Sequence, residues 1–154
     1  GVNVHTIVGN HDVYYKNTNE VNAVDSLLES YDNVVRYSSA TEIDIDGFQT
    51  LLLPWICQDN YDESMKAIKN TKCKSAFGHL ELNGFQLFPG MVQTNAHMNM
   101  DVSAFKKLDV VFLDIIIQDP MMVKYFIWVI RTKYFGMMQG TREDFIYLIQ
   151  ILMN

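Results

Sequence analysis

The sequence predicts a mixed α/β domain in which helices flank a layered β-sheet. Two observations support this fold class. Along the first 113 residues, apolar and β-branched runs of strand length alternate with segments whose apolar residues recur at helical spacing. The dipeptide Asp46-Gly47 also joins two strand-like segments, and Asp-Gly is a favoured turn of tight β-hairpins. A hairpin within an alternating α/β pattern indicates a sheet with both parallel and antiparallel strands.

The individual elements follow from local patterns. Strands are expected where apolar residues alternate or run together between turn residues, at 2–8, 34–37, 42–46, 48–53, 74–77 and 109–113. Helices are expected where apolar residues recur three or four positions apart, at 19–31, at 61–70 and over the short segment 102–107. Residues 83–100 are rich in Gly, Pro and Asn, and we expect them to be mostly loop.

The composition indicates one globular domain and excludes several other classes. The chain has 154 residues, of which 49% are hydrophobic and 19% charged. Cys57 and Cys73 suit neither a disulfide framework nor a zinc site, so we expect a reducing, cytoplasmic location. No secretory signal and no membrane span is predicted, since charged residues interrupt every apolar stretch. The net charge of −6 offers no basic surface for nucleic acid. It does not exclude a nuclease, because bound divalent cations carry positive charge of their own.

The strongest chemical signal follows the first predicted strand, where residues 9–12 are Gly-Asn-His-Asp. Ligand sites of open α/β sheets form at the carboxyl ends of strands. Asn10 offers a carbonyl oxygen, His11 a nitrogen that exchanges a proton near neutral pH, and Asp12 a carboxylate that can orient an imidazole. The alternative interpretation is a polar turn in which Asn and Asp bond to their own backbone. The strand before the motif and the glycine within it favour the chemical interpretation.

The motif at residues 9–12 resembles the Gly-Asn-His-Asp/Glu block of the calcineurin-like metallophosphoesterases. A second match is Gly78-His79, at the end of another buried strand, and the stretch 77–85 is similar to the nuclease subunit of phage recombination endonucleases, relatives of the double-strand-break repair nucleases. Pro54-Trp55, Gly90 and the segment 105–112 fit the same branch. The resemblance covers residues 1 to about 113. It implies a partial metallophosphoesterase domain, a layered mixed sheet flanked by helices.

The resemblance also implies roles for four residues. Asn10 and His79 would be ligands of the second of two divalent metal ions, with manganese the expected metal. His11 would lie over the phosphate, stabilise the transition state and help to protonate the leaving oxygen, while Asp12 would fix its tautomer. Imidazole and carbonyl ligands suit manganese or zinc. Two cations about 3.5–4 Å apart would activate water and clamp the attacking and leaving oxygens.

Several neighbouring residues receive weaker interpretations. Glu81 lies two positions beyond His79 and is expected to be solvated. Tyr14 and Tyr15 follow the first motif and are candidates for a substrate groove, although ordinary surface or core positions are the simpler interpretation. His5 lies within a predicted strand and His97 within a predicted loop, and we expect neither to take part in the chemistry.

Three family blocks are missing from this chain. The Asp-x-His block for the first metal and the Gly-Asp block with the bridging carboxylate would both precede Gly9, where the chain has only eight residues. We therefore expect a fragment whose N-terminal part is absent. The family's Gly-His-x-His block is also missing after the strand at 109–112, where residues 113–119 are Leu-Asp-Ile-Ile-Ile-Gln-Asp.

Residues 114–154 form an apolar tail for which two explanations stay open. Permitted codons for the residues after Phe112 can encode a Gly-His-x-His block in another reading frame, so we hypothesise that this tail is frame-shifted. Alternatively, it is a genuine divergent segment, with a buried helix or strand at 121–130 and an apolar helix at 145–153. The coding DNA on both sides of this frame would decide between the two.

The sequence thus predicts a fragment of a metal-dependent phosphodiester hydrolase, a DNA exonuclease or endonuclease subunit of a phage recombination-repair complex. DNA, a coiled-coil ATPase subunit and a second copy of the chain are the expected partners, in the host cell cytoplasm. We expect this fragment alone to be inactive, because catalytic metal sites usually have about three protein ligands per ion. Two alternatives stay open. One is a phosphoesterase for phosphoproteins or small phosphodiesters, and the other is a non-catalytic α/β binding module with vestigial motifs.

Overall fold

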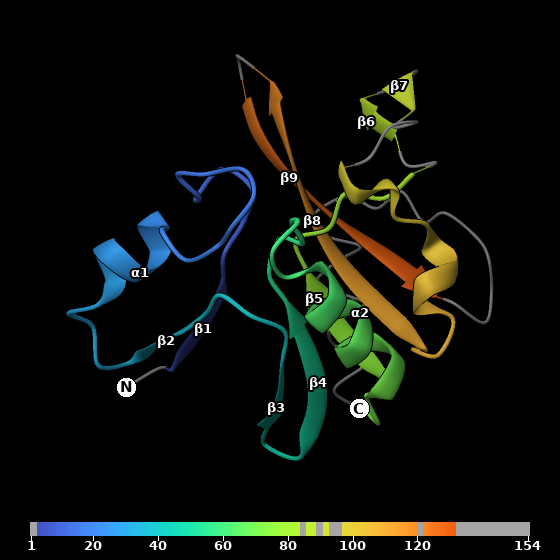
Figure 1. The fold of residues 1–154 in the computed structure, drawn as a ribbon, viewed down its shortest axis with the longest axis horizontal. Coiled ribbons are helices and arrows are strands. Elements are labelled where there is room, and N and C mark those ends of the chain that lie inside the picture. Colours follow the sequence, from blue (N-terminus) through green and yellow to red (C-terminus); the bar gives the residue numbers. More distant parts are fainter. Residues whose placement is uncertain (1–2, 84–85, 89–90, 93–96, 120–121, 132–154) are drawn as a thin grey trace.

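The computed structural model describes the backbone of residues 3–83, 86–88, 91–92, 97–119 and 122–131, and the side chains of residues 3–83 and 98–113. These residues form a mixed α/β fold, as the sequence predicts (Figure 1). The described strands belong to a five-stranded sheet of order β3-β4-β5-β8-β9 and to two smaller pairs, β1-β2 and β6-β7.

The first pair joins β1 (Val4–Ile7) and β2 (Val34–Tyr37) in parallel, with Val4 opposite Val34. Helix α1 (Ala23–Leu28) lies in the connection between them. This helix is shorter than the predicted segment 19–31. The side chain of Asn22 accepts a hydrogen bond from the Asp25 backbone N–H and thereby caps the helix at its N-terminus.

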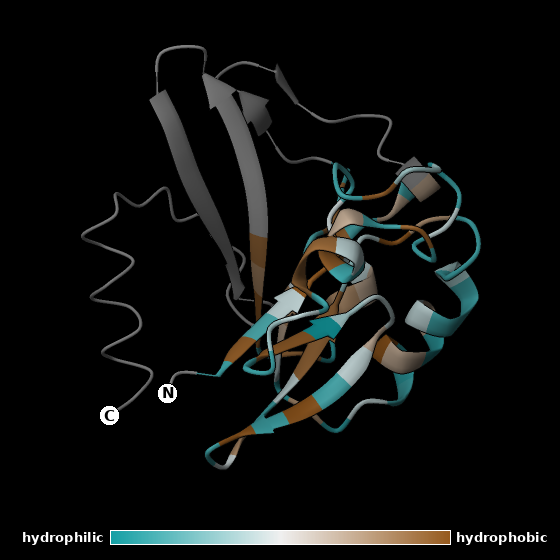
Figure 2. Cartoon of the chain, turned by 90° about the vertical axis from the view of Figure 1, so that its left-hand side faces the viewer, coloured by the Kyte–Doolittle hydropathy of each residue, from teal (hydrophilic) through white to brown (hydrophobic). Residues whose placement is uncertain are grey.

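The five-stranded sheet begins with the predicted hairpin. Strand β3 (Thr41–Ile45) pairs antiparallel with β4 (Phe48–Leu53). Asp46 and Gly47 have φ angles of 53° and 88°, which is the left-handed conformation that this two-residue turn requires. The hairpin, at the bottom of Figure 2, alternates hydrophilic and hydrophobic residues along its strands.

Strands β4, β5 (Ser75–Gly78) and β8 (Val110–Asp119) are parallel neighbours, and β9 (Met122–Arg131) pairs antiparallel with β8. Strand β8 continues six residues beyond the predicted end at 113 and passes through Ile115, Ile116 and Ile117, whose branched side chains favour extended backbone. The predicted domain boundary at residue 113 therefore lies within a strand. Whether residues 113–154 are frame-shifted stays a prediction.

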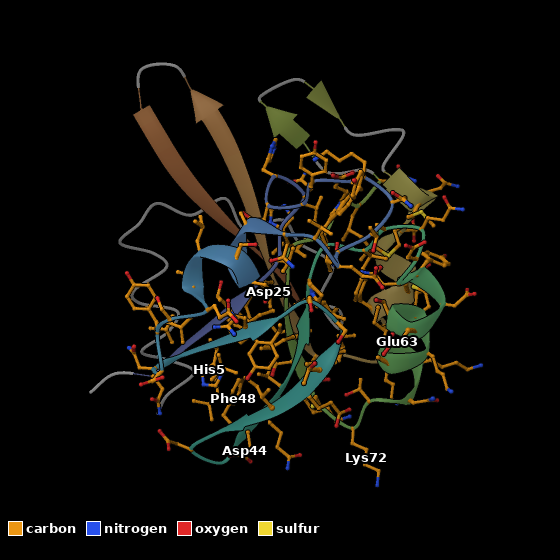
Figure 3. All side chains as sticks on the ribbon, turned by 60° about the vertical axis from the view of Figure 1, so that its left-hand side comes forward. His5, Asp25, Asp44, Phe48, Glu63 and Lys72 are labelled. Carbon is orange, nitrogen blue, oxygen red and sulfur yellow. The ribbon has the colours of Figure 1, made fainter. Side chains whose placement is uncertain are left out.

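Helix α2 (Tyr61–Asn70) has the predicted bounds and packs over one face of this sheet (Figure 1). Ile68 faces inward, whereas Glu63 is exposed on the outer side of the helix (Figure 3). The 3₁₀ helix η2 (Val102–Phe105) contributes the fully buried Phe105 to the same core. The buried members of this core come from β4, α2, β5, η2 and β8 and the segments between them: Leu51, Leu53, Ile56, Ile68, Cys73, Ala76, Leu80, Leu82, Met100, Phe105, Leu108, Val111 and Leu113.

The segment predicted to be loop contains short regular elements. These are β6 (Gln86–Phe88), β7 (Met91–Val92) and the 3₁₀ helix η1 (His97–Asn99). Gly90, the predicted helix at 145–153 and the side chain of His97 lie outside what the structure describes. None of the helices in the described ranges is long and apolar enough to cross a membrane.

Candidate functional site

The carboxyl ends of three strands meet at one place in the fold. The backbone N–H of Trp55, just after β4, donates to the Val8 carbonyl at 2.8 Å, just after β1. On the other side of β4, the N–H of His79 donates to the Leu53 carbonyl at 3.1 Å. These two bonds place the segments that follow β1 and β5 on either side of the end of β4. The two predicted motifs are therefore neighbours.

Beneath the first motif, a small apolar cluster supports this junction. Val8, Val13, Trp55 and Cys57 are buried together, with Val24 of α1 packed against them. The cluster anchors the segment after β1 to the segment after β4, separately from the larger core under α2. The polar residues of the first motif are thus flanked by buried, well-packed side chains.

Asn10 and His79 contact each other directly. Their Oδ1 and Nε2 atoms lie 3.0 Å apart, and both side chains are partly buried. The Nδ2 group of Asn10 donates to Oε1 of Glu81, also at 3.0 Å. With the amide oriented in this way, Nε2 of His79 is the donor in the Asn10–His79 hydrogen bond. Two side chains separated by 69 residues in sequence form one site.

Glu81 belongs to this site, although the sequence interpretation left it in solvent. Its carboxylate accepts the Asn10 amide hydrogen bond and is only partly exposed. Residues two positions apart in an extended segment face the same side, so the spacing between His79 and Glu81 was the available signal. The site therefore gathers an imidazole nitrogen, an amide oxygen and a carboxylate.

The backbone at residues 9–12 forms a closed turn. The Asp12 N–H donates to the Gly9 carbonyl at 3.1 Å, and Oδ2 of Asp12 accepts from the Gly9 N–H at 2.7 Å. Gly9 is also packed tightly: a Cβ atom there would lie 3.1 Å from Oδ2 of Asp12 and 3.2 Å from Nδ1 of His79. Glycine thus permits the close approach of this turn to the His79 ring.

His11 is exposed and has no hydrogen-bond partner among the residues that the structure describes. The hydrogen bond that Asp12 accepts comes from the turn backbone rather than from the imidazole of His11. Asp12 therefore shapes the turn, as the alternative interpretation of a polar turn anticipated. The His11 imidazole is thus exposed next in sequence to Asn10, and no hydrogen bond among the described residues fixes its ring.

Lys16 is a further residue of this region that the sequence analysis did not identify. Its Nζ atom donates to the Asn10 backbone carbonyl and lies 5.8 Å from the centroid of the Trp55 ring. Both contacts fix a positive charge beside the candidate site. Tyr14 and Tyr15, immediately before it, are exposed.

The other histidine with a described side chain lies elsewhere. His5 is on β1, where its Nδ1 atom lies 2.9 Å from the Tyr37 hydroxyl and its ring stacks on that of Tyr37. Within the described ranges, no group of three or more His, Cys, Asp or Glu side chains is arranged to hold a metal ion. The potential metal-binding groups at this site are the Asn10 amide oxygen, Nε2 of His79 and the Glu81 carboxylate, which contacts the amide nitrogen.

Comparison with known proteins finds a phage protein that is similar to part of this chain. No family model and no solved structure matches the chain. The chain is 45% identical over 91 residues to Exonuclease subunit 1 of Enterobacteria phage T4. The matched stretch covers 59% of this chain but only 27% of that protein. The chain is therefore a relative of a phage nuclease subunit and spans about a quarter of that protein's length.

Proposed function

We propose that this chain is part of a metal-dependent phosphodiester hydrolase, a phage nuclease subunit of the calcineurin-like metallophosphoesterase type. The contact between Asn10 and His79 is the observation that carries the proposal. Similarity to a phage exonuclease subunit supports a nuclease-related role. We further propose that the complete protein acts on DNA, together with a coiled-coil ATPase subunit and a second copy of itself.

The residues present fit a divalent cation. Ligands bound at about 2.1 Å in octahedral geometry lie about 3 Å from their neighbours, and Oδ1 of Asn10 is 3.0 Å from Nε2 of His79. Nitrogen and oxygen donors of this kind suit manganese or zinc. The Glu81 carboxylate next to Asn10 adds the negative charge that a cation favours. Binding would require the ring proton of His79 to lie on Nδ1 rather than Nε2, because metal ligation uses the neutral imidazole.

Each residue then has a defined task. The metal ions would supply a Lewis acid and a hydrolytic nucleophile when bound. Asn10 and His79 would hold one ion, with Glu81 keeping the Asn10 amide oriented. His11, exposed beside them, would donate a proton to the leaving oxygen of the phosphodiester. Asp12 would hold the backbone turn that positions both His11 and Asn10.

Manganese binding by the 154-residue chain tests the proposal. We expect Mn²⁺ to raise the melting temperature of the wild-type chain, because a ligand that binds only the folded state stabilises it. The substitution His79→Ala should abolish this shift. The matched control is His5→Ala, which removes an exposed imidazole from β1, the strand before the first motif, but leaves Asn10 and His79 unchanged (Figure 3). Equal Mn²⁺ shifts in the wild type and in His79→Ala would contradict the proposal.

A nuclease assay tests the expected incompleteness of the site. Asn10, His79 and Glu81 offer at most three donors, whereas two-metal catalysis needs about three protein ligands for each ion. We therefore expect no turnover of duplex or single-stranded DNA by this chain in Mn²⁺. Robust cleavage that disappears in His79→Ala would contradict this expectation, because it would show that the 154-residue chain supplies enough ligands.

A second candidate function is a non-catalytic binding module. The side chains of Asn10, His79 and Glu81 satisfy one another by hydrogen bonds without any ion, which is the observation in its favour. In that case Mn²⁺ should leave the melting temperature unchanged, and His79→Ala should lower it equally with and without the metal. The manganese titration described above thus separates the two functions.

A further inference from the structure

Two exposed tyrosines directly follow the Gly-Asn-His-Asp turn. The Tyr14 side chain is 76% exposed and that of Tyr15 is 53% exposed. Their rings contact each other edge to face, with centroids 4.8 Å apart and an angle of 80° between the planes. Because most of each ring faces solvent, the pair presents aromatic surface that the described part of the fold does not bury.

The backbone beneath this pair is fixed by hydrogen bonds. Val13 forms an isolated antiparallel bridge with Asn22, and the Tyr14 N–H donates to the Val21 carbonyl at 3.0 Å. Next to the bridge, the Ala23 N–H donates to the Asp12 carbonyl at 2.8 Å. Hydrogen bonds therefore hold the backbone that carries the exposed rings, and this segment is not a free loop. A fixed backbone reduces the conformational entropy that the pair would lose on binding a flat ligand.

The aromatic pair also lies close to the proposed phosphodiester site. The Cα atoms of Asn10 and Tyr14 are at most about 15 Å apart, since consecutive Cα atoms are about 3.8 Å apart. Lys16 bridges the two features, because it follows Tyr15 directly and its Nζ atom contacts the Asn10 carbonyl. A cation beside aromatic surface is the combination by which proteins hold the phosphates and bases of single-stranded nucleic acid.

We propose that Tyr14 and Tyr15 form a stacking platform for an unpaired base of single-stranded DNA, next to the phosphodiester held at Asn10 and His79. This inference rests on the proposed nuclease function and deepens it by naming the form of the substrate. Base faces are accessible in a single strand but are covered by their neighbours in a duplex.

Oligonucleotide binding by the full chain tests the platform without requiring catalysis. The probe is a fluorescently labelled oligothymidine of about 12 nucleotides, followed by anisotropy at low salt. We expect the double substitution of Tyr14 and Tyr15 by Ala to weaken binding about tenfold. The double substitution by Phe should bind like the wild type, because it keeps both rings. Tyr31→Ala is the matched control, since Tyr31 is 54% exposed but lies outside the motif region.

Two further probes separate stacking from charge. An abasic strand of the same length keeps its phosphates, and we expect it to bind the wild type as weakly as oligothymidine binds the double Ala variant. A duplex of the same length should also bind more weakly than the single strand. The inference is overturned if the abasic or duplex probe binds as well as oligothymidine, if the double Ala variant binds like the wild type, or if oligothymidine does not bind.

The proposed metal function would fail in a different measurement. Stacking is measured without Mn²⁺. The metal site is tested by the increase in melting temperature with Mn²⁺ and by the loss of this increase in His79→Ala. Retained Mn²⁺ binding with no effect of the tyrosine substitutions would overturn only the platform. Loss of the metal function with intact oligothymidine binding would leave a single-strand binding module.

Discussion

Nε2 of His79 lies 3.0 Å from Oδ1 of Asn10, and Nδ2 of the same amide lies 3.0 Å from Oε1 of Glu81. One amide thus connects an imidazole and a carboxylate from the segment after β5 to the turn after β1. Both hydrogen bonds form without a metal, because Nε2 of His79 donates to the amide oxygen and the amide nitrogen donates to the carboxylate. The amide oxygen faces the imidazole nitrogen, and the carboxylate lies beside the amide nitrogen.

Replacing the Asn10 amide by a carboxylate should separate its hydrogen bond to Glu81 from its proposed role as a metal ligand. In Asn10→Asp without metal, the donor to Glu81 is lost and two carboxylates face each other, so we expect a loss of about 1 kcal/mol in the free energy of unfolding. With Mn²⁺ the added charge should strengthen binding, and the loss should shrink or reverse. Urea unfolding of the wild type and variant, with and without Mn²⁺, measures both effects.

Glu81→Gln is the control for this experiment, because it removes a charge from the same site and leaves Asn10 unchanged. It should weaken the stabilisation by Mn²⁺ rather than strengthen it. If Mn²⁺ stabilises Asn10→Asp no more than it stabilises the wild type, Asn10 is not a ligand.

The tight approach of Gly9 to His79 gives a second prediction. In Gly9→Ala the new methyl group would lie 3.2 Å from the His79 ring and 3.1 Å from Oδ2 of Asp12. We expect the ring to move away from Asn10 and the free energy of unfolding to fall by about 1 kcal/mol. The imidazole NMR signals of His79 report the displacement, and urea unfolding reports the stability.

Gly47→Ala is a suitable comparison for Gly9→Ala. A Cβ atom at Gly47 meets nothing within 4 Å, but the φ angle there is +88°. It should therefore lower stability by about 1 kcal/mol through backbone strain alone. The His79 signals should stay where they are in the wild type. Unshifted His79 signals in Gly9→Ala would show that the ring does not depend on this glycine.

The charge of Asp101 gives a pH-dependent prediction. Hydrogen bonds from the backbone and side chain of Ser103 lower the pKa of the Asp101 carboxyl below 3.8, with a smaller contribution from Lys106. A lowered pKa in the folded state adds stability above pH 3.8, and this contribution disappears as the pH falls through the folded value. Asp101→Asn keeps an oxygen that can cap η2 but removes the charge.

Urea unfolding at several pH values checks this expectation. Near neutral pH the wild type should be more stable than Asp101→Asn, and the difference should diminish below pH 3.8. Asp44→Asn offers a comparison, because Asp44 also accepts a backbone hydrogen bond, from the Gly47 N–H, but lies in strand β3 just before the hairpin turn. A stability difference for Asp101→Asn that does not change with pH would show that its charge has no part in holding η2.

Much of the fold could be predicted because periodicity and turn residues in the local sequence determine the individual helices, strands and turns. The bounds of β2 and α2 agree with the sequence prediction, and Asp46-Gly47 forms the hairpin turn. The predicted bounds were wrong where contacts between distant segments determine the end of a helix or strand. Helix α1 begins only at Ala23, because the side chains of Asn19 and Asn22 are buried and bonded to backbone groups. Strand β8 is longer than expected, because pairing with β9 extends it.

The sequence by itself determined which residues stand at the ends of strands, since periodicity and glycine positions depend only on neighbouring residues. The prediction that Asn10 and His79 share one site came instead from the resemblance of residues 9–12 and 78–79 to motifs of a known family. Only the tertiary structure decided that Glu81 completes the contact and that Asp12 bonds to the turn rather than to His11. The physical reason is that hydrogen bonds between segments 69 or 71 residues apart depend on how β1, β4 and β5 align, which no local pattern encodes.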